Sequence, residues 1–197
     1  MMTAGMKLAP EEQMTIEEFL GFTDTRPDGE RWELIEGVAI MNPAPVEYHQ
    51  LVVLNIGSYL MTHQERTGAS WQPLLGVGTR VPVSPRSLPQ PDVFVKEGKA
   101  TDSAVTDDAL VIFEVLSRSN TRTDQAWRRR VYASVPNCQH YVTVSLKAVA
   151  VDAYDRETGW RKRALIGLGD GLSLPALALS IPLAVIYRGT PLAPRQA

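Results

Sequence analysis

The strongest indication of the fold is a continuous apolar run at 110–116, with the sequence Leu-Val-Ile-Phe-Glu-Val-Leu. A run of this kind is typical of a strand buried on both faces of a sheet, so other elements must cover both faces. One carboxylate, that of Glu114, interrupts the run. Because side chains alternate along a strand, Glu114 is expected on the same face as Ile112 and Leu116. The run therefore predicts a central strand that carries a single acidic group.

Glu114 is expensive to bury, because an ionised carboxylate loses its hydration unless something compensates for the charge. A metal ion, a strong hydrogen-bond donor or the edge of a cleft would each compensate for it. The alternative is an edge strand on which Glu114 simply faces water. Glu114 is thus the first candidate for a functional residue.

The rest of the chain alternates between helical and extended patterns, and strands outnumber helices. Helical periodicity and capping signals predict helices at 15–21, 46–66 and 123–134. Runs rich in β-branched and aromatic residues predict strands at 31–35, 38–41, 71–75, 79–83, 92–95, 140–145, 149–154 and 160–165. The first two strands flank Glu36-Gly37 and predict an N-terminal β-hairpin. The class is α/β or α+β with a mixed central sheet.

The size and composition indicate one domain and exclude several kinds of site. A chain of 197 residues, 44% of them hydrophobic, can bury a core of its own. We expect the domain at 14–190, with flexible tails at 1–13 and 191–197. One cysteine and three histidines exclude an internal disulfide framework and a multi-cysteine zinc site, and argue against a histidine-rich one. Metal ligands are therefore expected to be carboxylates, which suit Mg²⁺-like ions rather than Zn²⁺.

Charge and hydropathy narrow the class of protein further. The formal net charge of −2 excludes a uniformly basic nucleic-acid coat protein, but it does not exclude a local basic groove. No stretch approaches the ~20 apolar residues of a membrane span, and the segment 1–7 lacks the apolar core of a signal peptide. We therefore expect a soluble, cytoplasmic protein with no membrane partner.

Asp92 is the second carboxylate of interest, since it follows Pro91 directly at the start of an expected strand. Taken alone, it is best explained as a solvated residue at the beginning of a strand. Asp92 and Glu114 lie 114 − 92 = 22 residues apart, which leaves room for a loop and an adjacent strand. Two neighbouring strands that meet at a cleft would place both carboxylates on one cation, such as Mg²⁺ or Mn²⁺. The pair therefore predicts a metal site.

The order of these residues along the chain resembles that of a known nuclease superfamily. After Pro91-Asp92 come the matching residues Glu114, Asp124, Arg128 and Tyr132. This order is similar to that of the PD-(D/E)XK restriction-endonuclease-like superfamily, and more narrowly to its Uma-type family of bacterial proteins. Further segments resemble the same family at 32–37, 47–50, 135–144 and 174–177. The resemblance covers most of the chain.

The resemblance implies an α/β fold with a restriction-endonuclease-like mixed central sheet flanked by helices. It implies an endonuclease that hydrolyses nucleic-acid phosphodiester bonds with Mg²⁺ or Mn²⁺ held by Asp92 and Glu114. DNA is favoured over RNA as the substrate, and the family implies a homodimer. Glu33 is implied as a third acidic group, against the alternative of a solvated strand face. His49 is a candidate for acid–base work or a phosphate contact, against a packed or surface position.

One position departs from the family pattern and bears on catalysis. Leu116 stands where the superfamily has its lysine, and the Uma-type alternative, four residues after Asp124, is Arg128. Arginine keeps the positive charge, but its pKa is too high for it to accept a proton. If the reaction needs a neutral amine, the protein is weak or inactive; if it needs a cation, Arg128 suffices. The alternative function is therefore a binding module for nucleic acid or protein with the same fold.

Arginines that follow Glu114 in the sequence are candidates for nucleic-acid contacts. Arg118 and Arg122 come first, followed by three consecutive arginines at 128–130. Such a cluster predicts salt-sensitive contacts with phosphates that are largely blind to base sequence. The alternative is that the last of these arginines form the solvated face of an ordinary helix. We expect one or two of the five side chains to touch nucleic acid.

Overall fold

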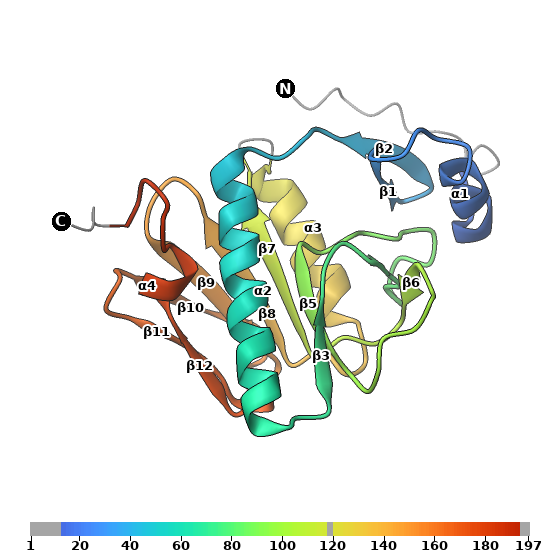
Figure 1. Cartoon of the computed structure of the whole chain (residues 1–197). Helices are drawn as coiled ribbons and strands as arrows, with labels where there is room; N and C mark the ends of the chain where they lie inside the picture. Colours follow the sequence, from blue (N-terminus) through green and yellow to red (C-terminus); the bar gives the residue numbers. More distant parts are fainter. Residues whose placement is uncertain (1–12, 118–119, 194–197) are drawn as a thin grey trace.

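A six-stranded mixed sheet forms the centre of the protein in the computed structural model, which describes residues 13–117 and 120–193 (Figure 1). Its strands are β3 (Trp71–Leu74), β5 (Val93–Glu97), β7 (Val111–Leu116), β8 (His140–Ser145), β9 (Ala150–Asp155) and β10 (Arg161–Ile166). The order across the sheet is β10-β9-β8-β7-β5-β3. Strands β7 and β8 run parallel, while all other neighbours run antiparallel. The mixed central sheet expected from the sequence is confirmed.

Two helices cover the opposite faces of β7, as a strand apolar on both faces requires. Helix α2 (Glu47–Thr67) lies on one face, and α3 (Arg122–Ala133), which connects β7 to β8, lies on the other (Figure 1). Phe113 packs in one core cluster with Val52 of α2, whereas Ile112 packs in another with Val131 of α3. Glu114 shares the face of Ile112 and is therefore directed toward α3. The alternation expected along the run is confirmed.

The C-terminal segment covers the face of the sheet on which α2 lies. It forms a hairpin of β11 (Gly171–Leu174) and β12 (Leu179–Pro182), followed by the short helix α4 (Leu183–Ile186). Their apolar residues, among them Leu172 and Ile186, belong to the same buried cluster as α2. Short 3₁₀ turns at Arg156–Thr158 and Pro175–Leu177 complete this part of the chain. The carboxylate of Glu114 lies on the other face of β7, which α3 covers.

An N-terminal unit of one helix and one hairpin borders the sheet beside β5. Helix α1 (Ile16–Thr23) begins with the predicted capping box of Thr15 and Glu18. Strands β1 (Arg31–Ile35) and β2 (Val38–Asn42) form the predicted hairpin, whose turn residues Glu36 and Gly37 have φ values of 50° and 81°. A bridge between Leu34 and Leu88 ties this hairpin to the segment that leads into β5. The hairpin thereby brings Glu33 of β1 close to the sheet.

Some expected elements differ from the structure. The strand expected at 79–83 is wrong: the chain forms only β4 (Gly78–Thr79), which pairs with β6 (Val105–Thr106). Pro82 has no N–H to donate to a ladder, and a turn from Val81 to Ser84 ends the extended backbone. Strand β5 begins at Val93, so that Asp92 lies just before it.

Two further features are the ends of the domain and the capacity of the helices to cross a membrane. Of the expected tails at 1–13 and 191–197, residues 1–12 and 194–197 lie outside the described ranges, so the domain division stays a prediction. Among the described residues, none of the helices combines the length and apolar character needed to cross a bilayer.

Candidate active site

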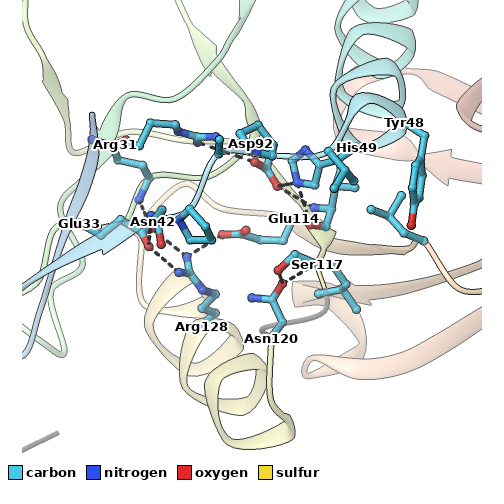
Figure 2. A pocket seen from close by; sticks show the side chains of 18 of the residues that line it. Arg31, Glu33, Asn42, Tyr48, His49, Asp92, Glu114, Ser117, Asn120 and Arg128 are labelled. Carbon is cyan, nitrogen blue, oxygen red and sulfur yellow. Dashed lines mark hydrogen bonds and ion pairs between the residues drawn. The ribbon is translucent and has the colours of Figure 1, made fainter. Parts of the chain in front are cut away.

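A cavity of about 670 Å³ lies where β7 and β8 end and β5 begins. The β1–β2 hairpin, the start of α2 and the segment after β7 supply its other walls. The charged residues that line it are Arg31, Glu33, Asp92, Glu114, Arg128 and Lys147. Figure 2 shows most of these side chains pointing toward one another across the cavity. Residues far apart in the sequence thus meet at one edge of the sheet.

Asp92 and Glu114 come together because β5 and β7 are neighbours in the sheet. The antiparallel register pairs Val93 with Phe113, so the residue before β5 lies beside the residue after Phe113. The backbone N–H of Val115 donates to Asp92 Oδ2 at 2.8 Å and holds that carboxylate at the strand end. The expectation that two adjacent strands bring both carboxylates to one cleft is confirmed.

The Glu114 carboxylate is anchored through one oxygen. Tyr132 donates its hydroxyl hydrogen to Glu114 Oε1 at 2.8 Å, and Arg128 Nη1 donates to the same atom at 3.0 Å. Both donors come from α3, four residues apart and therefore on one face of the helix. Within the described part of the chain, Glu114 Oε2 has no hydrogen bond. The residue is 7% exposed and lies on a central strand, so the alternative of an edge-strand carboxylate facing water is wrong.

Arg128 lies among three carboxylates and is itself only 8% exposed. Its Nη1 and Nη2 donate to the two oxygens of Glu33 at 3.1 and 2.7 Å, a bidentate pair. Its Nε donates to Asp124 Oδ1 at 3.3 Å, one helical turn earlier. Every nitrogen of the guanidinium therefore serves a carboxylate of the protein. The side chain at the position where the resemblance expects lysine is locked in place.

Glu33 is buried, at 2% exposure, so the alternative of a solvated strand face is wrong. Besides the bidentate pair with Arg128, its Oε1 accepts the backbone N–H of Gln90 at 2.7 Å. Its Oε2 accepts an N–H of Asn42 at 3.0 Å. Both oxygens are thus occupied by donors of the protein, and the β1–β2 hairpin is bound through them to α3.

His49 stands beside Asp92, in the first turn of α2. Its Nε2 lies 3.2 Å from the carbonyl oxygen of Val115 and 3.5 Å from Asp92 Oδ2. The residue is 6% exposed, and its Nδ1 has no hydrogen-bond partner among the described residues. Of the alternative packed or surface positions, the structure shows the packed one, with the ring in the lining of the cavity.

Three residues that line the cavity were not predicted from the sequence. Arg31, Asn42 and Lys147 line the cavity, although none lies in a pattern that marks function. Arg122, predicted to contact nucleic acid, is exposed on the first turn of α3 and is not among the lining residues. Arg118, predicted for the same role, lies outside the described residues. The contacts predicted for both arginines therefore stay predictions.

Comparison with known proteins identifies the family. The model of the Uma2 family, described as "Putative restriction endonuclease", matches residues 16–185, which is most of the chain and includes every candidate catalytic residue. The chain belongs to the Uma2 family. The family resemblance inferred from the residue order is thereby confirmed.

Two relatives of this Uma2 chain are of interest. An "Uncharacterized protein slr1290" from Synechocystis is 36% identical over 104 residues. That match spans 50% of this chain and 54% of the relative, so about half of each protein is compared. A crystal structure of a "putative nuclease belonging to DUF820" from Anabaena variabilis superposes with a TM-score of 0.70. It is 16% identical, and the match covers 88% of this chain and 97% of that one, which shows the shared fold.

The electrostatics of the Uma2 site differ sharply between its two buried glutamates. Burial raises the pKa of Glu114 from the ordinary value of 4.5 to about 8; Arg128 opposes this, while the charges of Asp92 and Glu33 add to it. Burial alone would also raise the pKa of Glu33, but the charge and hydrogen bonds of Arg128 hold it below its ordinary value. Arg128 therefore keeps the pKa of Glu33 low, whereas it does not overcome the effect of burial on the pKa of Glu114.

The stability of the metal-free protein should fall as the pH rises from about 5 to 8. Folded Glu114 keeps its proton up to about pH 8, whereas the unfolded chain releases it near 4.5. Between these values the folded state binds more protons, so the free energy of unfolding should decrease by up to about 1.4 kcal/mol per pH unit. Urea unfolding across this range in the presence of EDTA measures the slope. The Glu114→Gln variant should lose this component, and equal slopes in both proteins would contradict the assignment.

The donor set of the Uma2 site suits a hard divalent cation. Asp92 and Glu114 each have one oxygen held by protein donors and offer oxygen ligands to the same cavity. The described residues contain no cluster of three or more His, Cys, Asp or Glu side chains arranged for a metal. Mg²⁺ is commonly held by one or two carboxylates, with water and substrate oxygens completing its shell. The residues present therefore fit Mg²⁺ or Mn²⁺ and do not fit a closed, structural metal site.

Proposed function

We propose that this protein is a metal-dependent endonuclease that hydrolyses phosphodiester bonds of nucleic acid. The observation that carries the proposal is the pair Asp92 and Glu114, each carboxylate fixed through one oxygen at the rim of the same cavity. Membership of the Uma2 family supports the same reaction class. DNA is the proposed substrate ahead of RNA, and a homodimer the proposed assembly, both on the resemblance to the family.

Asp92 and Glu114 would hold the metal. When bound, Mg²⁺ or Mn²⁺ would lower the pKa of a water molecule and offset negative charge on the phosphate. The protein's part is to keep the two carboxylates close without allowing them to separate. The backbone N–H of Val115 does this for Asp92, and the hydroxyl of Tyr132 does it for Glu114.

Arg128 is proposed as a positioning residue rather than as a proton acceptor. It bonds Glu114 Oε1 and both oxygens of Glu33, and so sets the orientation of the carboxylate that would hold the metal. Because the guanidinium stays protonated, the geometry supports the mechanism in which a cation suffices. Glu33, whose oxygens are both occupied, takes part through Arg128 and not as a direct ligand.

His49 is proposed to help hold the Asp92 carboxylate in position. Its Nε2 can donate to the carbonyl oxygen of Val115, whose N–H binds Asp92. That tautomer leaves Nδ1 as an acceptor, and no described residue donates to it. This nitrogen is itself buried, so the proposed role of His49 rests on Nε2.

A cleavage assay with metal removal tests the proposed function. Purified protein is incubated with supercoiled plasmid DNA and, separately, with a labelled RNA, in the presence of Mg²⁺ or Mn²⁺. We expect metal-dependent nicking or cleavage of DNA that EDTA abolishes and added Mn²⁺ restores. If neither substrate is cleaved with either metal, the proposal fails. Binding without cleavage would then favour the alternative of a binding module, which the complete occupation of Arg128 by carboxylates would help to explain.

A further inference from the structure

The cavity contains as many basic side chains as carboxylates, but they are not equivalent. The acidic side chains are those of Glu33, Asp92 and Glu114, and the basic ones are those of Arg31, Arg128 and Lys147. Arg128 is buried, and every one of its nitrogens donates to a carboxylate of the protein. Its charge is therefore already neutralised by its neighbours. A phosphate entering the cavity would have to find its cationic partner elsewhere.

Arg31 meets that requirement on one side of the cavity. It is the first residue of β1, and its side chain retains 34% exposure. Its nearest ionic neighbour in the described structure is Asp92 Oδ1 at 3.9 Å, too far for a hydrogen bond. Figure 2 shows the guanidinium reaching toward Asp92 from the hairpin. Within the described residues, Arg31 is thus tied to a proposed metal ligand by one long ion pair and by no hydrogen bond of its side chain.

Lys147 meets the same requirement from another part of the fold. It lies in the bend between β8 and β9, beyond the end of the strand that runs parallel to β7. The side chain is exposed, and no carboxylate of the described chain forms an ion pair with it. Arg31 and Lys147 come from elements at different walls of the cavity, so they place two cations around the carboxylates, one in a long ion pair with Asp92 and one with no carboxylate partner among the described residues.

Phosphate binding needs such cations because the carboxylates alone would repel it. Like charges brought together in a partly desolvated cavity disfavour binding, whereas Arg and Lys provide charge-assisted hydrogen bonds to phosphate oxygens. We propose that Arg31 and Lys147 bind backbone phosphates of the nucleic acid, Arg31 beside the bond to be cleaved and Lys147 next to it along the strand. This inference rests on the proposed function, because it concerns the substrate of the same site. It adds contacts at cavity residues to those predicted from the sequence for Arg118 and Arg122.

Binding of labelled nucleic acid, measured without metal, tests the inference separately from catalysis. Fluorescence anisotropy in EDTA at low salt compares a labelled duplex DNA and a labelled single-stranded RNA on wild type, Arg31→Ala and Lys147→Ala. Each variant should raise the dissociation constant by ~5-fold or more and reduce the salt dependence by about one unit per lost phosphate contact. Arg31→Lys, which keeps the charge, should recover part of the loss. In Mn²⁺, each alanine variant should raise KM more than it lowers kcat.

Two control variants remove the same charges at the opposite end of the sheet. Arg161 lies opposite Asp155 in the strand register, at the end of the sheet where β8 begins. Lys99 follows the last residue of β5, whereas the cavity lies at the start of that strand. Arg161→Ala and Lys99→Ala should leave binding unchanged. If Arg31→Ala and Lys147→Ala bind as tightly as wild type, or no more weakly than the controls, the inference is overturned, even where wild type cleaves DNA. Failure of wild type to cleave, with binding weakened as described, would overturn only the proposed function.

Discussion

Replacing Arg128 by alanine is expected to lower the free energy of unfolding by about 3–5 kcal/mol. The guanidinium is the ionic partner of Glu33 and Glu114, which are 2% and 7% exposed. Its removal would leave the charge of Glu33 buried without its counterion, and that loss is not compensated by water. Urea denaturation at pH 7 with far-UV circular dichroism measures the change.

A neighbouring arginine on the same helix provides the control. Arg130 is 62% exposed in its side chain, and its ion pair with Glu36 spans 3.9 Å. Surface pairs of this kind contribute less than about 1 kcal/mol, so Arg130→Ala should barely change the unfolding curve. Comparable costs for both alanine variants would contradict the buried network around Arg128.

Arg128→Lys separates the two mechanisms left open by the sequence. Lysine keeps the charge but cannot form the bidentate pair with Glu33, so we expect a smaller loss of stability than for alanine. If Arg128 acts by positioning Glu114, the lysine variant should cleave at a rate similar to or below that of wild type. A large gain in cleavage would instead show that a neutral amine is required at this position, and would reject the positioning role.

Asp92→Asn and Glu114→Gln are each expected to reduce the cleavage rate by at least about a hundredfold, since a bound metal would contribute several kcal/mol to stabilising the transition state. Each substitution replaces a proposed carboxylate ligand by a neutral amide of the same shape. The affinity for Mn²⁺, measured by calorimetry, should fall in parallel. Both variants should remain folded, and Glu114→Gln should be at least as stable as wild type at pH 8, because it removes a buried charge close to Asp92 and Glu33.

Glu65→Gln is the matched control for this pair. Glu65 lies exposed near the end of α2, whereas the cavity meets the start of that helix. Its substitution removes the same charge and should change neither cleavage nor Mn²⁺ affinity. Unchanged Mn²⁺ binding in both Asp92→Asn and Glu114→Gln would reject the metal site.

Local patterns in the sequence were sufficient to predict most of the fold. The capping box at Thr15, the hairpin turn at Glu36-Gly37 and the doubly apolar strand β7 all depend on residues close together in the chain. Alternation along β7 was also enough to predict which face carries Glu114. The strand expected at 79–83 failed because β propensity does not supply a ladder partner where Pro82 and a turn interrupt the backbone.

The burial and the ion pairs of the site residues depend on contacts between segments that are distant in the sequence. Arg128 and Glu33 are separated by 95 positions, and no pattern in the sequence indicates that the arginine is fully engaged by carboxylates. Nor does the sequence distinguish Arg31 and Lys147, which both line the cavity, from other surface charges. Side-chain periodicity is a property of a few adjacent residues, whereas burial and ion pairing depend on which elements the tertiary fold packs together. The two carboxylates could therefore be predicted from the sequence. The ion pairs of the cations around them depend on how the hairpin and α3 pack against the sheet.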